Sequence, residues 1–402
     1  MKRIHYAWLV CLGCALLIFC TSGLCINAFT VYQPYIVAEN GFTNAQSSAI
    51  ITVRTLFGFV GMLLTGGYYR RLSLRSGMTL AGLLTAAGIM IFAFAKTYAV
   101  YLAAAAATGL GYGLGSMIPI AIMLNHWFAR KRTLALGICS ASTGLSTLGI
   151  PSLLTWLIEE RGLRPAFQAE AIAVAALIVL SFLLIRNTPA DKGMEPLGAD
   201  MGAEETKKNT CLGTLGKKNW IILTPAMLML GALTMSGYGH LTMLSDTEGF
   251  SSQVTALAIT VSGLALTAGK FIFGALADRW GTYRCNWLFG AVLIGGLALL
   301  CVSGSGTAML MAGMCTYGAG LGLTTVGNTA WAGDMSTPEQ YDRTIRRFQL
   351  YYTGGGMLFG SVPGLLADRF GGSYVPAYLI FTAFAVILLL TVQWTYRHLE
   401  KV

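Results

Sequence analysis

The sequence predicts an all-α membrane protein whose twelve transmembrane helices form two pseudo-symmetric halves of six helices each. Three observations support this fold class. Of the 402 residues, 55% are hydrophobic and 11% are charged, whereas a soluble domain carries about 25% charged residues. Twelve apolar runs approach or exceed the ~20 residues that a membrane span requires. Motifs in the first six runs recur in the last six, which predicts an internal repeat.

The expected spans cover residues 6–30, 47–69, 76–95, 100–126, 133–157, 167–185, 220–243, 253–276, 286–303, 307–332, 348–367 and 374–396. One connection is long and polar, with six Lys/Arg and five Asp/Glu between residues 186 and 219. We therefore expect an N-terminal half at 1–185, a solvated linker at 186–219 and a C-terminal half at 220–402.

Basic residues predict the orientation of these spans. Of the 27 Lys and Arg, 21 fall on one side, including those of the linker and of both termini, and four fall on the other. The positive-inside rule then places both termini and the linker in the cytoplasm. The formal charge of +10 is thereby explained as a topology signal, so we expect no nucleic-acid partner. The two remaining cations, Arg54 and Lys270, lie inside spans.

The repeat has an offset of 208 residues. It pairs Gly61 with Gly269, Gly66 with Gly274, Arg71 with Arg279, Arg54 with Ser262 and Met62 with Lys270. Parallel repeats of this kind occur in transporters whose halves enclose a site near the middle of the membrane. The two intramembrane cations would then stand on matching helices of opposite halves, at different depths.

A charged turn ends the eighth expected span, and it carries a resemblance over the full chain. Gly274, Asp278, Arg279 and Gly281, followed by Arg284, match the Gly-x-x-x-Asp-Arg-x-Gly signature of the major facilitator superfamily. The resemblance implies a cytoplasmic gate in which Asp278 accepts hydrogen bonds from a neighbouring helix end. We include Arg71 of the first-half copy in this gate.

Two other turns resemble this signature, but one lacks its aspartate and the other lies on the opposite predicted side of the membrane. In the first-half copy, Arg70 replaces the aspartate. A third turn, Gly364 to Gly371 with Asp368, lies on the predicted outer side. It is either a further copy or an ordinary polar helix end.

Two stretches resemble the monocarboxylate porters and the oxalate/formate antiporters within that superfamily. The run His126–Gly137 is similar to their loop between the fourth and fifth spans, and Lys270 stands where they carry a substrate-binding Arg. Two departures are a Leu at position 266, where some proton-coupled members carry an acid, and an eleventh span without Lys, where oxalate exchange uses a second cation. The resemblance implies transport of a small organic anion.

The cations themselves favour the same site. A charge inside a membrane span costs about 2.5–3.5 kcal/mol on the insertion scale and usually faces a bundle interior or a cavity. Both side chains could instead extend to an interface. The seventeen Asp and Glu lie in loops or at span ends, with Glu170 alone near a helix interior, so we expect two unpaired cations and no intramembrane proton carrier. The polar residues that would complete the substrate site are Asn27, Tyr112, Tyr238, Tyr317, Asn328 and Tyr351.

Glycines and cysteines have structural interpretations. The run Gly109–Gly115 lacks the preceding strand and the following Lys of a nucleotide-binding loop, and we expect it, with Gly318, Gly320 and Gly322, to permit close approach of helices. Four of the nine cysteines lie in the first apolar run and are expected to be small apolar fillers. Pro119, Pro151 and Pro363 are expected to kink their helices.

The sequence thus predicts a secondary active transporter in which Lys270, with Arg54, holds a mono- or dicarboxylate at the membrane midplane while the halves alternate in access. Exchange is slightly favoured over proton symport. The alternatives are a facilitator for a neutral or cationic solute, such as a drug or a sugar, and a non-transporting membrane sensor. We expect no enzymatic activity, cofactor or metal, and a monomer in the plasma or inner membrane. A counter-anion or a proton would be the second ligand.

Overall fold

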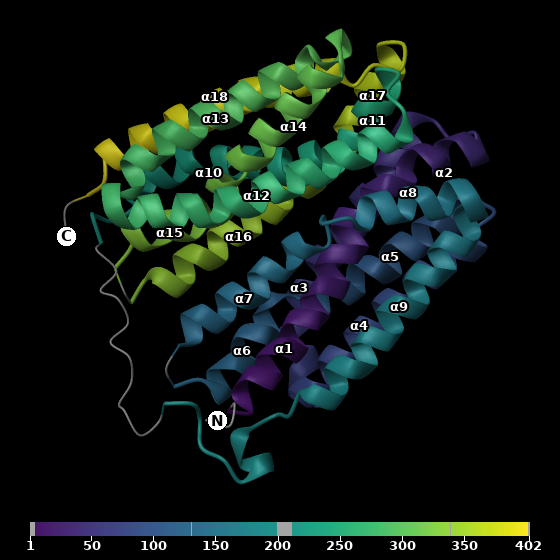
Figure 1. Cartoon of the computed structure of the whole chain (residues 1–402). Helices are drawn as coiled ribbons and strands as arrows, with labels where there is room; N and C mark the ends of the chain where they lie inside the picture. Colours follow the sequence, from purple (N-terminus) through teal and green to yellow (C-terminus); the bar gives the residue numbers. More distant parts are fainter. Residues whose placement is uncertain (1–4, 130, 199–210, 338, 401–402) are drawn as a thin grey trace. The chain divides into compact units, whose positions relative to one another are not determined.

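The computed structural model describes residues 5–129, 131–198, 211–337 and 339–400 (Figure 1). Contacts divide the chain into two units. The first comprises Met1–Tyr32 and Val53–Glu205, and the second comprises Gln33–Thr52 and Thr206–Val402. Most of each predicted half lies within one unit. The segment Gln33–Thr52 is the exception, because it belongs to the second unit by its contacts, whereas the sequence predicted it as part of the first half. The part of the linker at 199–210 lies outside the described residues.

Seven of the α-helices lie wholly within the first unit. Its helices are α1 (Ala7–Ile18), α4 (Leu74–Phe94), α5 (Tyr98–Leu114), α6 (Met117–Trp127), α7 (Arg132–Leu145), α8 (Ile150–Arg161) and α9 (Leu163–Leu184). Two further helices, α2 (Tyr32–Asn40) and α3 (Asn44–Arg71), run across the division between the units. Helix α4 packs against both α5 and α9, and α1 packs against α7 and α9 (Figure 1).

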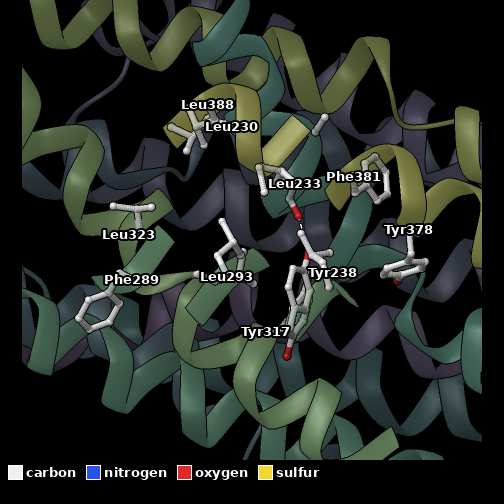
Figure 2. Close-up of a cluster of buried hydrophobic side chains, with 14 of the residues drawn as sticks. Leu230, Leu233, Tyr238, Phe289, Leu293, Tyr317, Leu323, Tyr378, Phe381 and Leu388 are labelled. Atoms are coloured by element: carbon white, nitrogen blue, oxygen red, sulfur yellow. Dashed lines mark hydrogen bonds between the residues drawn. The ribbon is translucent and has the colours of Figure 1, made fainter. Parts of the chain in front are cut away.

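The second unit repeats this plan. Its helices are α10 (Lys217–Gly231), α11 (Leu241–Thr247), α12 (Ser252–Trp280), α13 (Thr282–Cys301), α14 (Thr307–Gly320), α15 (Asn328–Asp334), α16 (Tyr341–Leu358), α17 (Val362–Arg369) and α18 (Val375–Arg397). Helix α13 packs against α14 and α18, and α10 packs against α16 and α18. Figure 2 shows part of the buried core that these helices share, with side chains such as Leu233, Leu293 and Phe381.

Within the described residues, eleven helical stretches are long and apolar enough to cross a membrane. They correspond to eleven of the twelve predicted spans and confirm the all-α membrane fold. The first is longer than expected and continues to Asn40, because residues 31–38 carry no charge. The predicted span 348–367 is instead divided into α16 and α17.

Prolines explain the division of three stretches. Pro151 and Pro363 stand at the first or second position of α8 and α17, and Pro119 stands at the third position of α6. A proline lacks the backbone donor that would extend the preceding helix. Each proline therefore begins a new helix after a break, where the sequence suggested a kink within one helix.

Glycine contacts confirm both the repeat and the close approach of helices. A Cβ placed on Gly109 of α5 would lie 2.2 Å from the backbone oxygen of Arg54 on α3. In the second unit, a Cβ on Gly318 of α14 would lie 2.2 Å from the backbone oxygen of Ser262 on α12. Both distances are too short for any side chain, so only glycine permits these two equivalent contacts.

Glycines one turn further along each run contact the same partner helix up to about two turns further on. A Cβ on Gly113 would lie 2.9 Å from the backbone nitrogen of Met62. Its counterpart on Gly322 would lie 3.0 Å from the backbone nitrogen of Lys270. Lys270 therefore occupies the position that the 208-residue offset predicts for it.

Two adjacent glycines of α13 provide a test of this packing. A Cβ on Gly296 would lie 2.3 Å from the backbone nitrogen of Tyr317, whereas a Cβ on Gly295 would meet nothing within 4 Å. We expect Gly296→Ala to lower the free energy of unfolding by about 1–3 kcal/mol because it overpacks the α13–α14 contact. The measurement is the midpoint temperature of thermal unfolding of the purified protein in detergent.

Gly295→Ala is the matched control for this substitution. It should leave the midpoint unchanged or raise it, because alanine favours a helix by roughly 1 kcal/mol over glycine. Equal midpoints for the two variants would show that the α13–α14 contact is not limited by the glycine.

Candidate functional site

Three π-helical segments interrupt the spans and precede or contain predicted site residues. They are η1 (Phe19–Asn27), η5 (Ala232–Gly237) and η7 (Leu323–Gly327). Asn27 is the last residue of η1, Tyr238 follows η5 and Asn328 follows η7. Because π segments are rare and frequent at functional sites, these local departures from the α-helix support the choice of the three residues.

Lys270 is the charged residue of the second unit inside a span. It lies near the middle of the second half of α12, partly buried, and its backbone contacts Gly322 next to α14. In the described part of the chain its ammonium group has no hydrogen bond or ion pair. Three strong donors on a partly buried cation are therefore available to a ligand.

Six buried side-chain oxygens of the same unit also lack hydrogen-bond partners among the described residues, and three of them concern the candidate site. These three are the Tyr238 hydroxyl, the Ser262 hydroxyl and the Asn328 side-chain carbonyl, and none of them has a hydrogen bond with a described residue. An unsatisfied buried polar group costs about 1–3 kcal/mol, so such groups are commonly reserved for a ligand or water. Ser262 was not among the predicted site residues, although its equivalence to Arg54 in the repeat could have indicated it.

Tyr317 has a different environment from Tyr238. Its hydroxyl donates a hydrogen bond to the Leu233 carbonyl at 2.5 Å (Figure 2), and the Tyr378 hydroxyl donates to the Gly237 carbonyl at 2.7 Å. Both carbonyls belong to the π-helical segment η5. Tyr317 therefore supports that segment, and its hydroxyl proton is already used in this hydrogen bond. Tyr351, another predicted site residue, lies partly buried against the core of the same unit.

Arg54 of the first unit is buried and already paired. Only 3% of its surface is exposed. Its guanidinium donates to the Cys25 carbonyl at 2.8 Å and lies 4.3 Å from the centre of the Phe29 ring. The expectation of an unpaired cation is wrong for this residue, because the loosened backbone of η1 supplies an acceptor. Its part in substrate binding stays a prediction.

The other two predicted residues of the first unit lie close to Arg54 in the fold. Tyr112 is partly buried, and its ring meets α3 at Gly58. The Asn27 amide donates to the Thr143 carbonyl of α7 at 3.2 Å. The cysteines of this region, such as Cys20 and Cys25, are buried free thiols, as expected for apolar fillers.

Glu170 lies deeper within its helix than the sequence analysis predicted. It is the eighth residue of α9 and is 7% exposed. Its carboxyl group lies within electrostatic range of the Arg54 guanidinium and of the Tyr32 side chain. The Tyr32 hydroxyl makes no hydrogen bond with a described residue. The expectation that no acid is available inside a span is therefore wrong. The span begins at Leu163, four residues before its expected start, which places Glu170 deeper.

The predicted cytoplasmic gate has the local geometry of a sharp turn. Helix α12 ends at Trp280, and Gly281 follows with a positive φ of 83°, a conformation that favours glycine. Its N–H donates to the Ala277 carbonyl at 3.0 Å. The remaining gate residues are wholly or partly exposed; they are Gly274, Asp278, Arg279, Arg284 and, at the end of α3, Arg71. The gating role of these residues stays a prediction.

A contact of the type expected for Asp278 is found at Asp368. Its carboxylate accepts hydrogen bonds from the backbone N–H groups of Asn44 at 3.0 Å and Ala45 at 2.9 Å. These are the first residues of α3, whose N-terminal N–H groups otherwise lack acceptors. The Tyr374 hydroxyl also donates to the Asn44 side chain at 3.3 Å. The third turn is therefore a capping element for another helix.

Two hydrogen bonds continue this contact along α3 within the second unit. The Ser48 hydroxyl lies 2.8 Å from Nε2 of His240, and the Thr52 hydroxyl lies 2.7 Å from that of Ser361. His240 is fully buried, and its Nδ1 donates to the Ser236 carbonyl at 2.8 Å. With Nδ1 as the donor, Nε2 of the neutral tautomer is the ring atom that accepts from the Ser48 hydroxyl.

Comparisons with known proteins agree with this architecture. A sequence profile described as the Major Facilitator Superfamily matches residues 14–255 and 240–401. Monocarboxylate transporter 12 of Mus musculus is 25% identical over 344 residues, which cover 78% of this chain and 70% of that protein. The aspyridones efflux protein apdF of Emericella nidulans is 25% identical over 284 residues, with 69% and 55% covered.

Solved structures show the same fold at low identity. The nucleoside transporter NupG superposes with a TM-score of 0.72 and 14% identity over 98% of this chain and 100% of its own. A D-xylose–proton symporter superposes with a TM-score of 0.73 and 13% identity, with 96% of each chain covered. At these identities the likeness concerns the fold.

The Asp368 cap leads to a stability prediction. Asp368→Ala should lower the free energy of unfolding by roughly 0.5–2 kcal/mol, the usual effect of removing a helix-capping acceptor. Asp368→Asn should have a smaller effect because its amide oxygen can still accept one bond. Thermal unfolding in detergent measures both. The adjacent exposed Arg369 is the control, and an Arg369→Ala effect as large as that of Asp368→Ala would exclude a specific cap.

Proposed function

Because the chain belongs to the Major Facilitator Superfamily, a family of membrane transporters and not of enzymes, we propose that its substrate is a small organic anion, most simply a mono- or dicarboxylate. The observation that carries this proposal is Lys270. It is a cation in an apolar helix, and no hydrogen bond or ion pair of the described residues engages it.

The charge of Lys270 has no counter-charge among the described residues. Placing Lys270 inside a span costs about 2.5–3.5 kcal/mol on the insertion scale. The close contact between the Lys270 backbone and Gly322 holds this turn of α12 against the C-terminal end of α14. The charged residue is therefore kept at a defined position. A carboxylate would offset this cost through charge-assisted hydrogen bonds.

Polar groups for the remainder of an organic acid are present in the same unit. The hydroxyls of Tyr238 and Ser262 and the carbonyl of Asn328 have no partners among the described residues. Hydroxyl groups can donate to a carboxylate or accept from a substrate hydroxyl. We propose that these three residues, with Lys270, contribute to substrate recognition, and that the buried Arg54 acts indirectly.

The relatives support a carboxylate and also a second candidate. The name of one relative, monocarboxylate transporter 12, agrees with the Lys270 argument. A relative of the same identity is named an aspyridones efflux protein, which favours efflux of a neutral or cationic solute as the second candidate. Transport in either case is secondary, driven by ion or solute gradients, and the bias of basic residues supports cytoplasmic termini. A monomer in the plasma or inner membrane remains part of the proposal.

Counterflow in liposomes tests the anion site. Purified protein would be given labelled oxalate, formate, lactate and pyruvate in turn. We expect saturable exchange of at least one acid. Lys270→Gln should lower the kcat/KM of exchange by about 10- to 150-fold, because a hydrogen bond to a charged group contributes about 1.5–3 kcal/mol. Lys270→Arg should lose less because it keeps the charge.

Lys96→Gln is the matched control, since it removes an exposed lysine outside the spans. Exchange unaffected by Lys270→Gln would keep the transporter and remove Lys270 from the site. If wild type exchanges none of the four acids but moves a neutral or cationic compound, the second candidate is correct.

A further inference from the structure

Two cysteine thiols of the first unit lie in contact although they are 128 residues apart in the sequence. The Sγ atoms of Cys11 on α1 and Cys139 on α7 are separated by 4.0 Å, and both residues are free cysteines. Only 1% of Cys11 and none of Cys139 is exposed. Within the described residues, no other two cysteine sulfurs are hydrogen-bonded to each other. The sequence predicted only an apolar filler at Cys11.

The backbones of α1 and α7 lie close together at this contact. The Cys11 thiol donates a weak hydrogen bond to the Ala135 carbonyl at 3.6 Å, and the Cys139 thiol donates to the Cys11 carbonyl, also at 3.6 Å. One turn further along, the Ser142 hydroxyl donates to the Ala15 carbonyl at 3.0 Å. Side chains this short reach the carbonyls of another helix only where the two backbones approach closely, and close approach is what a disulfide requires.

Packing alone does not require thiols at this place. The corresponding helices of the second unit, α10 and α16, also pack against each other. They do so through glycine, since a Cβ on Gly355 would clash with the Leu228 carbonyl. Cysteine at both positions of the first unit therefore adds a chemical property that the helix contact itself does not demand.

We propose that Cys11 and Cys139 form a redox-sensitive pair that a peroxide oxidises to a disulfide, which ties α1 to α7. One sulfur attacks a peroxide oxygen, the O–O bond breaks, a sulfenic acid forms and one water leaves. The second thiol then attacks the oxidised sulfur, so that the S–S bond forms and a second water leaves. The two thiols together lose two hydrogens and two electrons, and the peroxide accepts them.

Burial of the pair determines which oxidant can react with it. Buried structural cysteines are inert towards most reagents, and a bulky molecule has no access to a residue with no exposed surface. Hydrogen peroxide is uncharged and has only two heavy atoms, so small fluctuations of the helix contact admit it. The first step is slow for this reason. The second thiol is already in place, so it captures the sulfenic acid before further oxidation.

The position of the pair along its helices defines the resting state. Helix α1 begins at Ala7, four residues before Cys11, and α7 begins at Arg132, seven residues before Cys139. Both ends face the side that the basic residues indicate as cytoplasmic. Glutathione keeps thiols reduced in that compartment, so the dithiol is the resting form and the disulfide forms under oxidative conditions. This inference is independent of the transported substrate.

Peptide mapping of the whole purified protein tests the pairing. After treatment with hydrogen peroxide, the remaining thiols are blocked with N-ethylmaleimide under denaturing conditions, and the chain is cleaved after Lys and Arg without reduction. Residues 4–54 hold four cysteines, and residues 133–161 hold Cys139 alone, so the two sulfurs fall in separate peptides. We expect wild type to yield the two peptides joined and two hydrogens lighter than their sum. Dithiothreitol should separate them.

Cysteine variants identify the partner of Cys139. Cys11→Ala and Cys139→Ala should each abolish the joined species. The matched control is Cys14→Ala, which removes another buried thiol of α1 and should keep the joined species. A joined species that persists in Cys11→Ala overturns the proposal. Complete blocking of Cys139 by N-ethylmaleimide after peroxide treatment of wild type also overturns it, and that measurement does not depend on the folding of any variant.

Thermal unfolding tests the consequence of the bond. The disulfide joins residues 128 positions apart, so it should raise the midpoint temperature of wild type by about 5–15 °C after peroxide treatment. Peroxide-treated Cys139→Ala should show no such rise. An unchanged midpoint in cross-linked wild type would contradict a bond that ties the two helices. These readouts keep their meaning whether or not the protein exchanges an organic acid, so the proposed function can fail without deciding the fate of this pair.

Discussion

A charge buried among apolar helices must be balanced by the protein or left for a ligand, and the two units meet this constraint in different ways. In the first unit, Arg54 has the Cys25 carbonyl, the Phe29 ring and the carboxyl group of Glu170 around it. In the second unit, Lys270 has no such partner among the described residues. The first arrangement satisfies the cation within the protein, and the second leaves a cation that can bind an anion.

One scaffold places both cations. Glycines of α5 contact the α3 backbone at Arg54 and at Met62. Gly318 of α14 and Gly322 just beyond it make the equivalent contacts with the α12 backbone at Ser262 and Lys270. Because these contacts involve backbone atoms, the side chain at each equivalent position can differ while the helix pair keeps its geometry. The repeat therefore allowed the two units to carry different chemistry on the same frame.

The sequence was sufficient to predict the features that depend on local composition. Apolar runs define eleven of the observed spans, the 208-residue offset places Lys270 correctly, and the glycine runs act as predicted. The burial of Glu170 was not predictable, because it depends on a helix start four residues earlier and on Tyr32 and Arg54 from other helices. The Asp368 cap was left open for the same reason, since its partners Asn44 and Ala45 are remote in sequence. Orphaned oxygens such as that of Asn328 likewise become visible only when all neighbours are known.

The Asp368 cap also has a consequence for the order in which the protein is made. Asn44 and Asp368 are 324 residues apart, and synthesis proceeds at about 5–20 residues per second. The start of α3 must therefore wait roughly 15–65 seconds for its acceptor to leave the ribosome. During that interval Gln33–Thr52 has no partner from α17, so the second unit is completed only when nearly the whole chain has been translated. Loss of the last spans through a premature stop would thus leave an early segment of the protein unassembled.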